Sequence, residues 1–372
     1  MIALHNMVFL PKGADKALDH AVIDRQADRR NYGIDLLRLF SMFMVVVLHV
    51  LNRGGILANA QGPSYLQGWL AHIAAYAAVD CFGLISGYVG FTKQEKPFHY
   101  RKFVSFWLQV FIYNFGITLL FYLLKLPSQN QITLKTLIKS AFPILTGYYW
   151  YVRAYVGLFF VIPWLNKLIR NLSKKEFTLL VVILVGLAAF GSLKDTFELN
   201  NGKSFAWLVF LYIIGAWIKN NEIFSKLKTG VWFLILFGCV ILIWLWRIFS
   251  PVLPVLFINN TRPSILLTAV CMVCIFSRLS FKTNVQKLIR FFAPAAFGVY
   301  LIHVHFIIWD YYFLNAFSWI ASSSPLLFLP LVLGCATGIF MVCLLIDVLR
   351  LRLFKLMRVD SIINRISGSL GK

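Results

Sequence analysis

The sequence predicts an all-helical protein that crosses a membrane about ten times. Hydrophobic residues make up 60% of the 372 residues, charged residues only 13%, and the mean hydropathy is +0.76. A soluble domain carries about 25% charged residues. The apolar residues form runs of about 17–25 residues, the length of a membrane helix, and they do not alternate as in membrane β-strands.

Ten apolar segments are separated by basic loops. The predicted spans are 34–52, 68–91, 103–124, 146–166, 177–191, 204–219, 230–247, 262–278, 291–309 and 325–349. With a cytoplasmic N-terminus, 26 Lys and Arg residues fall in cytoplasmic segments and 8 in external segments. This asymmetry follows the positive-inside rule and predicts that both termini are cytoplasmic.

The net charge of +22 follows from this topology and does not indicate nucleic-acid binding. Basic cytoplasmic loops attract the anionic headgroups of membrane lipids, and they would also attract a polyanionic substrate. Residues 1–32 are predicted to be a cytoplasmic extension without a cleavable signal peptide, because no basic segment precedes their short apolar run. Residues 33–350 are predicted to form one membrane domain, and residues 351–372 a basic cytoplasmic tail.

The cysteines predict neither a metal site nor a disulfide. All six lie in predicted spans, where we interpret them as packing residues. Cys271 and Cys274 form a C-x-x-C pair, but one helical turn explains this spacing and no second pair supports a metal. The sequence also lacks the motifs of serine hydrolases, P-loop NTPases and zinc peptidases.

The first predicted span contains the most informative polar residues. Arg38 and His49 are 11 residues apart, so on a helix they share one face about 16 Å apart along the axis, and Asp35 leans toward that face. In one interpretation Arg38 extends to the lipid headgroups and His49 caps the helix end. In the other, the face forms a channel in which Arg38 binds an anionic cofactor and His49 accepts a proton from a hydroxyl.

The second span contains an aspartate that requires a polar partner. Asp80 is expected to pair with a cation or a hydrogen-bond donor, and the Arg or His of the first span is the obvious candidate. Tyr88 follows in the same span, in the run SGY. Helix packing is the simpler interpretation of this run, because Gly83 and Gly87 form a small-x-x-x-small pair.

Two later spans also carry polar residues. Trp150 and Arg153 lie in the aromatic run GYYWYVRAY. An interfacial aromatic belt explains the rings, whereas Arg153 either binds an anionic group of an acceptor or pairs with Asp80. His303 lies about 18 Å into the ninth span, where it is either a buried packing residue or lines a cavity. His305 is predicted to face another side of the helix.

Four segments, in this order, resemble the acyltransferase-3 family of integral membrane proteins. They are IDLLRLFSMFMVVVLH, CFGLISGYVGF, WYVRAYVGLFFVIPWLNKL and FGVYLIH, and the resemblance extends from residue 34 to about residue 350. The second and third are most similar to the branch that includes enterobacterial-common-antigen and surface-polysaccharide O-acetyltransferases. The resemblance implies a ten-helix enzyme of the bacterial inner membrane. Such an enzyme transfers an acyl group, usually acetyl, from cytoplasmic acyl-CoA to a hydroxyl of a glycan or lipid-linked saccharide.

The resemblance also implies roles for particular residues. His49 would be the catalytic histidine, as a base or a transient acyl carrier, with Arg38 as its partner and Asp35 beside it. Family members often carry an R-x-x-R after the second span, and here Arg101 and Lys102 occupy that loop without the second arginine. These two are the candidates for binding the CoA phosphates. The polar residues of the other spans are candidates for the acceptor side, no permanently bound cofactor is expected, and a homo-oligomer is left open.

A transporter or flippase for a glycolipid or a small polar solute is the alternative function. Intramembrane Arg and His residues can also line a conduction path. Transporters commonly contain internal repeats and broken helices. The sequence shows no clear repeat, and only the segments near Pro163 and Pro294 are weak candidates for breaks. A non-catalytic sensor or assembly protein has only the aromatic outer segments in its support.

Overall fold

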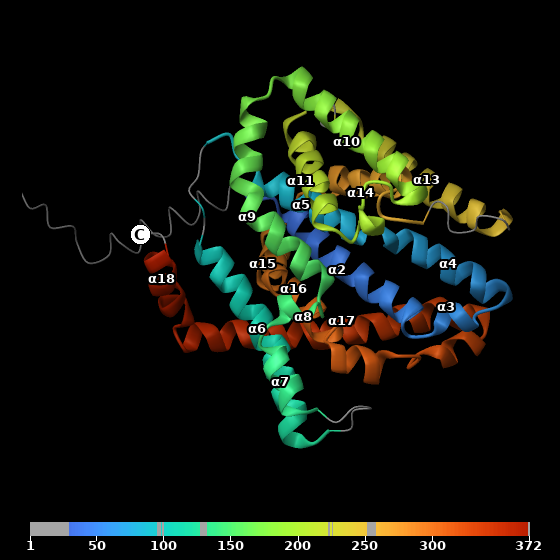
Figure 1. Cartoon of the computed structure of the whole chain (residues 1–372). Helices are drawn as coiled ribbons and strands as arrows, with labels where there is room; N and C mark the ends of the chain where they lie inside the picture. The colour runs from blue at the N-terminus through green and yellow to red at the C-terminus, as the bar shows by residue number, and fades with distance from the viewer. Residues whose placement is uncertain are drawn as a thin grey trace, which may run out of the picture.

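The described residues of the computed structural model form helices without a β-strand (Figure 1). These residues are 30–94, 98, 100–126, 132–221, 224, 226–250 and 258–370. Among them, 8 segments are long and apolar enough to cross a membrane: Tyr32–Asn59, Gly62–Gly90, Tyr100–Leu124, Trp150–Asn171, Lys174–Lys194, Thr229–Phe249, Thr283–His303 and Pro325–Leu356. Two shorter apolar helices, Phe205–Asn220 and Pro263–Phe276, coincide with the remaining predicted spans.

The predicted class of an all-helical, polytopic membrane protein is therefore confirmed. The number of crossings and the cytoplasmic position of the termini stay predictions. Nearly all of the predicted N-terminal extension lies outside the described residues.

Helix α2 (Tyr32–Asn52) is the central helix of the bundle. It packs against α4 (Gly62–Tyr76), α5 (Ala78–Gly90), α16 (Ala296–His303) and α17 (Pro325–Leu356). Asn31 caps its start, because the side-chain oxygen accepts a hydrogen bond of 3.0 Å from the amide of Ile34. Leu37 and Val46 are fully buried. Asp35 and Ser41, two polar residues of α2, are also buried inside the protein.

Close packing of α5 on α11 (Phe205–Asn220) depends on glycines. A Cβ atom at Gly87 would lie 1.9 Å from the carbonyl oxygen of Tyr212, and one at Gly215 would lie 2.1 Å from that of Leu84. A Cβ at Gly83 would also collide, at 2.5 Å, with Leu211. The predicted packing role of the small residues in the second span is therefore confirmed.

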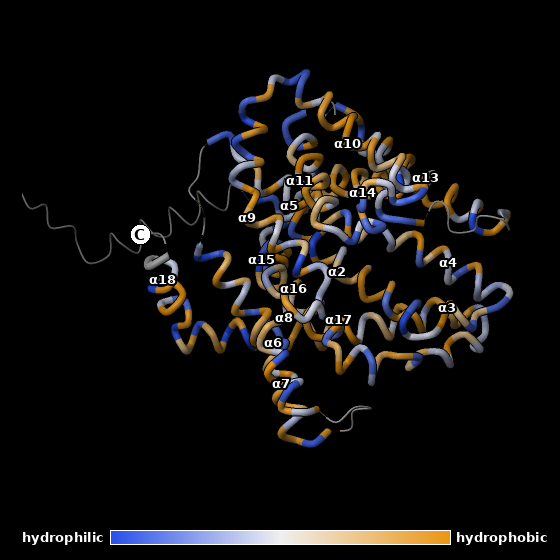
Figure 2. Tube along the Cα trace, in the orientation of Figure 1, coloured by the Kyte–Doolittle hydropathy of each residue, from blue (hydrophilic) through white to orange (hydrophobic). Residues whose placement is uncertain are grey.

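The remaining helices surround this core. They are α3 (Ile56–Asn59), α6 (Tyr100–Leu124), α7 (Leu134–Ser140), α8 (Pro143–Thr146), α9 (Trp150–Asn171), α10 (Lys174–Lys194), α13 (Thr229–Phe249), α14 (Pro263–Phe276), α15 (Thr283–Phe292) and α18 (Val359–Leu370). Figure 2 shows long hydrophobic stretches along α10, α13 and α17. Leu234, Phe190 and Leu326 on these helices are at least 75% exposed. Such surfaces suit contact with lipid tails.

The ninth predicted span differs from a single continuous helix. Its helix α15 ends at Phe292, the 3₁₀ turn η2 (Ala293–Ala295) contains Pro294, and α16 then ends at His303. After a turn, the π-helix η3 (Ile308–Phe313) continues the chain. The prediction of a span over residues 291–309 was therefore wrong in its boundaries. The end of α16 at His303 matters for the site, because the chain turns there.

The predicted basic tail also continues as helix. Helix α17 extends to Leu356, and α18 packs against α6, where Asp360 pairs with Arg101 at 3.1 Å. A short amphipathic helix thus lies beside the first turn of α6, where the structure places Arg101 and Lys102, which were predicted to lie in a loop. The other candidate break, Pro163, lies within the continuous helix α9.

Candidate active site

His49 and His303 form a hydrogen-bonded pair inside the helix bundle. Nδ1 of His49 lies 2.9 Å from Nε2 of His303, and the two ring centroids are 5.1 Å apart. The two residues are 254 positions apart in the sequence and come from α2 and α16. His303, at the end of α16, is only 1% exposed. Packing of α16 against α2 brings the two histidines together.

The hydrogen bonds determine which nitrogen of each neutral ring carries a proton. Nδ1 of His303 lies 2.6 Å from the carbonyl oxygen of Val299, which can only accept. Nδ1 of His303 is therefore the donor, and its Nε2 accepts a hydrogen bond from Nδ1 of His49. Nε2 of His49 then keeps a free lone pair, which is the form that a general base or nucleophile requires.

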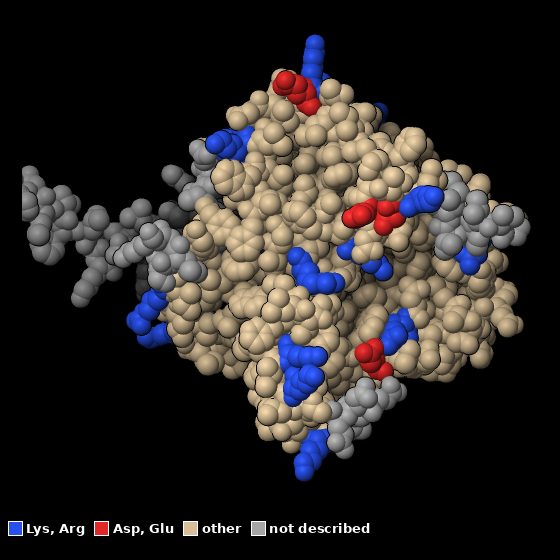
Figure 3. Space-filling model, in the orientation of Figure 1, with Lys and Arg blue, Asp and Glu red and all other residues tan. Residues whose placement is uncertain are grey.

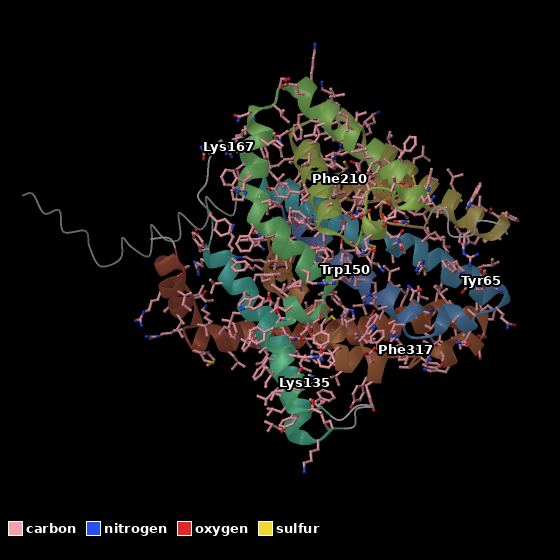
Figure 4. The ribbon with its side chains drawn as sticks, in the orientation of Figure 1. Tyr65, Lys135, Trp150, Lys167, Phe210 and Phe317 are labelled. Carbon is pink, nitrogen blue, oxygen red and sulfur yellow. The ribbon has the colours of Figure 1, made fainter. Side chains whose placement is uncertain are left out.

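A small, largely apolar cavity of about 60 Å³ adjoins His49. Its lining consists of Met42, Val45, His49, Val79, Phe82, Trp150, Tyr151, Phe297 and Tyr300. Figure 4 shows Trp150 where α9 begins, near the middle of the molecule. A cavity of this size admits a few water molecules or a small group such as acetyl. The site therefore suits the chemistry of a small group in largely apolar surroundings.

The residues that follow α16 cover another side of the His49 ring. The Trp309 ring lies 4.7 Å from the His49 ring and nearly perpendicular to it, at 79°. Arg53 holds this segment, because its guanidinium pairs with Asp310 at 2.5 Å and lies 5.6 Å from the Trp309 ring centre. The carbonyl of Arg53 also accepts a hydrogen bond of 2.9 Å from the amide of Asn315. The end of α2 and η3 are thus tied together beside His49.

A second cavity, of about 880 Å³, lies next to the first. Phe82, Tyr151 and Phe297 line both cavities. The polar groups of the larger one include Arg38, Ser86, Arg101, Lys102, Gln109, Asn166 and Asp360. Its volume is at the upper end of the range for small-molecule and cofactor sites, about 300–1,000 Å³. Three cations around a large cavity suit a ligand with several negative charges.

Arg38 belongs to this second cavity and lies far from the His49 ring. Its guanidinium pairs with Asp35 at 2.7 Å, and Arg30 pairs with the same carboxylate at 2.5 Å. Along α2, Arg38 and Asp35 are about 16 Å and 21 Å from His49. The structure therefore places Arg38 among the cations of the large cavity. It lies on the same helix as His49 but too far along it to contact the imidazole.

Asp80 has a hydrogen-bond donor as its partner, as expected, but the donor is not the Arg or His of the first span. The residue is fully buried, and its Oδ1 accepts a hydrogen bond of 2.9 Å from the indole nitrogen of Trp207 on α11. Its Oδ2 has no hydrogen-bond partner among the described residues. No local pattern predicts this contact, because the α5–α11 packing that produces it depends on residues more than 120 positions apart.

Two other predicted acceptor-side residues, Arg153 and Tyr88, lie on α9 and α5. Arg153 is exposed, has no ion-pair partner among the described residues, and lies against Gly147, where a Cβ atom would be 3.3 Å from the guanidinium. The ring centre of Tyr88 lies 5.8 Å from the Lys219 ammonium. Figure 3 shows that basic side chains outnumber acidic ones on the face in view. His305 contacts the backbone of Asn114 on α6, but it follows the end of α16, so its direction is set by the turn and not by a helical face.

The sequence analysis missed a buried ion pair that supports α16. Asp347 is fully buried and binds Arg350 through both oxygens, at 2.6 and 3.0 Å. The hydroxyl of Tyr113 donates to the same carboxylate at 2.6 Å. Gly298 packs directly against this group, since a Cβ atom there would lie 2.3 Å from the carboxyl carbon. The only sequence signal is an Asp–Arg pair at i,i+3 spacing.

Fold and site together define a class: an all-helical membrane protein with a histidine pair beside two adjacent cavities. The described residues contain no cluster of metal-ligating side chains. The sequence model of the acyltransferase-3 family, described as an acyltransferase domain, matches residues 31–347, so the chain belongs to that family and is a membrane acyltransferase. No curated protein and no solved structure matches it. The resemblance seen in the motifs is thus confirmed for the family.

Proposed function

We propose that this protein is an O-acyltransferase of the bacterial inner membrane. It takes an acyl group, with acetyl as the first choice, from cytoplasmic acyl-CoA and transfers it to a hydroxyl of a cell-surface or lipid-linked glycan. The observation that carries the proposal is the His49–His303 pair, which leaves Nε2 of His49 free to accept a proton beside a small apolar cavity. Family membership supports the acyl transfer itself.

The large cavity is the proposed site of acyl-CoA. Arg38, Arg101 and Lys102 line it, and phosphate groups bind best where several cations converge. The shared lining residues, such as Phe82 and Tyr151, connect it with the His49 cavity. The pantetheine arm would follow the face of α2 from Arg38 to His49. On this proposal Arg38 binds the donor and does not take part in the chemistry.

At His49 the reaction needs a base. Nε2 of His49 takes the proton from the acceptor hydroxyl while its oxygen attacks the thioester carbonyl. Collapse of the tetrahedral intermediate breaks the C–S bond, and the CoA thiolate takes up the proton. In the variant with an acyl-histidine, Nε2 attacks first and the hydroxyl attacks the acylated ring. In both variants His303 holds His49 in the required tautomer.

The experiment uses the full chain in nanodiscs, with radiolabelled acetyl-CoA and a bacterial surface polysaccharide as acceptor. His49→Gln is compared with His305→Gln, a matched change of a buried histidine outside the site. His305 bonds to the carbonyl oxygen of Asn114, and a glutamine amide can still donate there. We expect His49→Gln to lower transfer by about 10²–10⁴-fold, the usual contribution of a general base, with His305→Gln close to wild type.

Two results would contradict the proposal. If folded His49→Gln transfers acetyl at the wild-type rate, His49 has no role in the reaction. Movement of labelled glycolipid across a vesicle membrane, without any acetylation, would favour the transporter alternative.

A further inference from the structure

Tyr300 is a buried residue of the His49 cavity whose hydroxyl group has no hydrogen-bond acceptor in the described part of the protein. It lies on α16 one turn before His303, lines the same cavity as His49, and is only 7% exposed. Its hydroxyl donates a hydrogen bond to no described residue. Most buried polar groups in native proteins are paired, so an unpaired one in a reaction cavity points to a missing ligand.

The aromatic ring of Tyr300, and not its hydroxyl, fixes the position of the side chain. Its ring centre lies 5.7 Å from that of Tyr149, 6.2 Å from Tyr151, 6.0 Å from Phe297 and 6.5 Å from His303. These neighbours come from α16, from α9 and from the residue that precedes α9. The O–H group is therefore held in place although it donates no hydrogen bond to the described residues of the protein.

The surroundings of the hydroxyl suit developing negative charge. The Tyr300 oxygen lies next to the backbone amide of Tyr151, in the first turn of α9. Amides of a first helical turn have no acceptor within the helix, and the N-terminus of a helix favours anions. Arg153 lies two residues further along α9 and interacts electrostatically with Tyr300.

Arg38, the other candidate for stabilising negative charge in the reaction, is paired elsewhere. The thioester carbonyl becomes an oxyanion when it is attacked, and this oxyanion needs a hydrogen-bond donor. Arg38 is paired with Asp35 about 16 Å along α2 from His49, so it cannot reach a carbonyl at the histidine.

We propose that Tyr300 is a catalytic residue whose O–H donates a hydrogen bond to the oxyanion of the tetrahedral intermediate at His49. The inference rests on the proposed acyl transfer. The acceptor oxygen forms a bond to the carbonyl carbon, its proton goes to Nε2 of His49, and the carbonyl electron pair moves to the oxygen that faces Tyr300. The C=O bond then re-forms, the C–S bond breaks, and the proton passes from His49 to the CoA sulfur. Tyr300 keeps its own proton throughout.

The test compares Tyr300→Phe with Tyr149→Phe in the full chain in nanodiscs. Both changes remove one buried hydroxyl and keep a ring. The hydroxyl of Tyr149 donates to the carbonyl oxygen of Leu301 at 2.9 Å, so it has a structural partner that Tyr300 lacks. We expect Tyr300→Phe to lower kcat by about 10²–10³-fold, the usual effect of removing one oxyanion donor, with the KM for acetyl-CoA and the Tm unchanged. Tyr149→Phe should lower the Tm and leave kcat near wild type.

A second readout separates a catalytic hydroxyl from a structural one. Fluoroacetyl-CoA gives a more stable oxyanion than acetyl-CoA, so the loss caused by Tyr300→Phe should be smaller with the fluorinated donor. Equal losses with both donors would overturn the oxyanion role, and so would wild-type kcat in folded Tyr300→Phe. If wild-type protein transfers acetyl while Tyr300→Phe is unimpaired, only this inference fails. If wild type does not transfer acetyl, the proposed function fails and the inference fails with it.

Discussion

The two ends of the polar face of α2 differ in almost every physical property. Around Arg38 the cavity is large, about 880 Å³, and three cations line it. Around His49 the cavity is about 60 Å³ and its lining is mostly aromatic and aliphatic. Arg38 is bound to a carboxylate, whereas His49 bonds to a second neutral imidazole. One helix thus presents a site suited to binding an anion at one end and a site suited to proton transfer at the other.

This difference explains why the two residues need not touch. Charged ligands bind well where cations converge and water has access, because the ions stay partly solvated. An oxyanion and a neutral base act more strongly where water is excluded, since fixed dipoles there are not screened. A donor with a charged head and a long neutral arm can occupy both regions at once. On the proposed function, the donor therefore spans the separation of about 16 Å along α2, with its charged head at Arg38 and its thioester at His49.

Replacement of His303, the partner of His49, is expected to have the largest effect on kcat. Replacement by Phe removes the acceptor for Nδ1 of His49, so the catalytic tautomer is no longer selected. We expect kcat to fall by about 10²–10⁴-fold, in the range of general-base catalysis. His303→Gln should recover part of the loss, because its amide oxygen can accept from His49. Equal activity of the Phe and Gln variants, at equal folded yield, would mean that this hydrogen bond has no catalytic role.

The Arg38 end predicts a different kinetic signature. Arg38→Gln should raise the KM for acetyl-CoA by about 10–100-fold, the range for a lost hydrogen bond to a charged group, while kcat changes little. Arg38→Lys should lie between wild type and the Gln variant, because it keeps the charge and loses the planar geometry. Steady-state kinetics with varied acetyl-CoA measures both. A fall in kcat without a change in KM would place Arg38 in the chemical step and break the comparison.

Removal of the Trp309 ring, which covers one side of His49, is expected to change the reaction products and not only the rate. Trp309→Ala removes the ring that lies 4.7 Å from the His49 ring and admits water beside it. We expect hydrolysis of acetyl-CoA to increase by a few-fold relative to transfer to the glycan, because solvent exclusion suppresses such side reactions. The ratio of free acetate to acetylated glycan measures this. Trp319→Ala, at an exposed tryptophan, is the control and should keep the wild-type ratio.

The smallest expected effect is at the mouth of the large cavity. Asp360 on α18 pairs with Arg101 at 3.1 Å, and both side chains are more than half exposed. Asp360→Asn would free Arg101 for a phosphate, so the KM for acetyl-CoA should fall by less than about 5-fold, as for other exposed ion pairs. The difference from wild type should shrink at 0.5 M salt because of screening. An increase in KM would show that α18 helps to hold the donor and does not compete with it.

Local sequence patterns predicted the class of the protein well. Apolar runs of membrane length and their basic borders depend only on neighbouring residues, and each predicted span overlaps an apolar helix in the structure. The shared face of Arg38 and His49 follows from the period of one helix. The small-residue contact through Gly87 was also predictable, because glycine spacing reports close helix packing.

The partners of the polar residues could not be predicted in this way. His49 contacts a residue 254 positions away, and Asp80 contacts an indole 127 positions away, where the Arg or His of the first span was the expected partner. The role of Tyr300 could not be predicted either, because a hydroxyl that donates to no protein group is recognised only when every neighbour is known. Sequence by itself therefore determined the helices, the membrane class and the face on which Arg38 and His49 lie. Only the tertiary structure decided which side chains meet, because those contacts depend on how α9, α11 and α16 pack around α2 and α5.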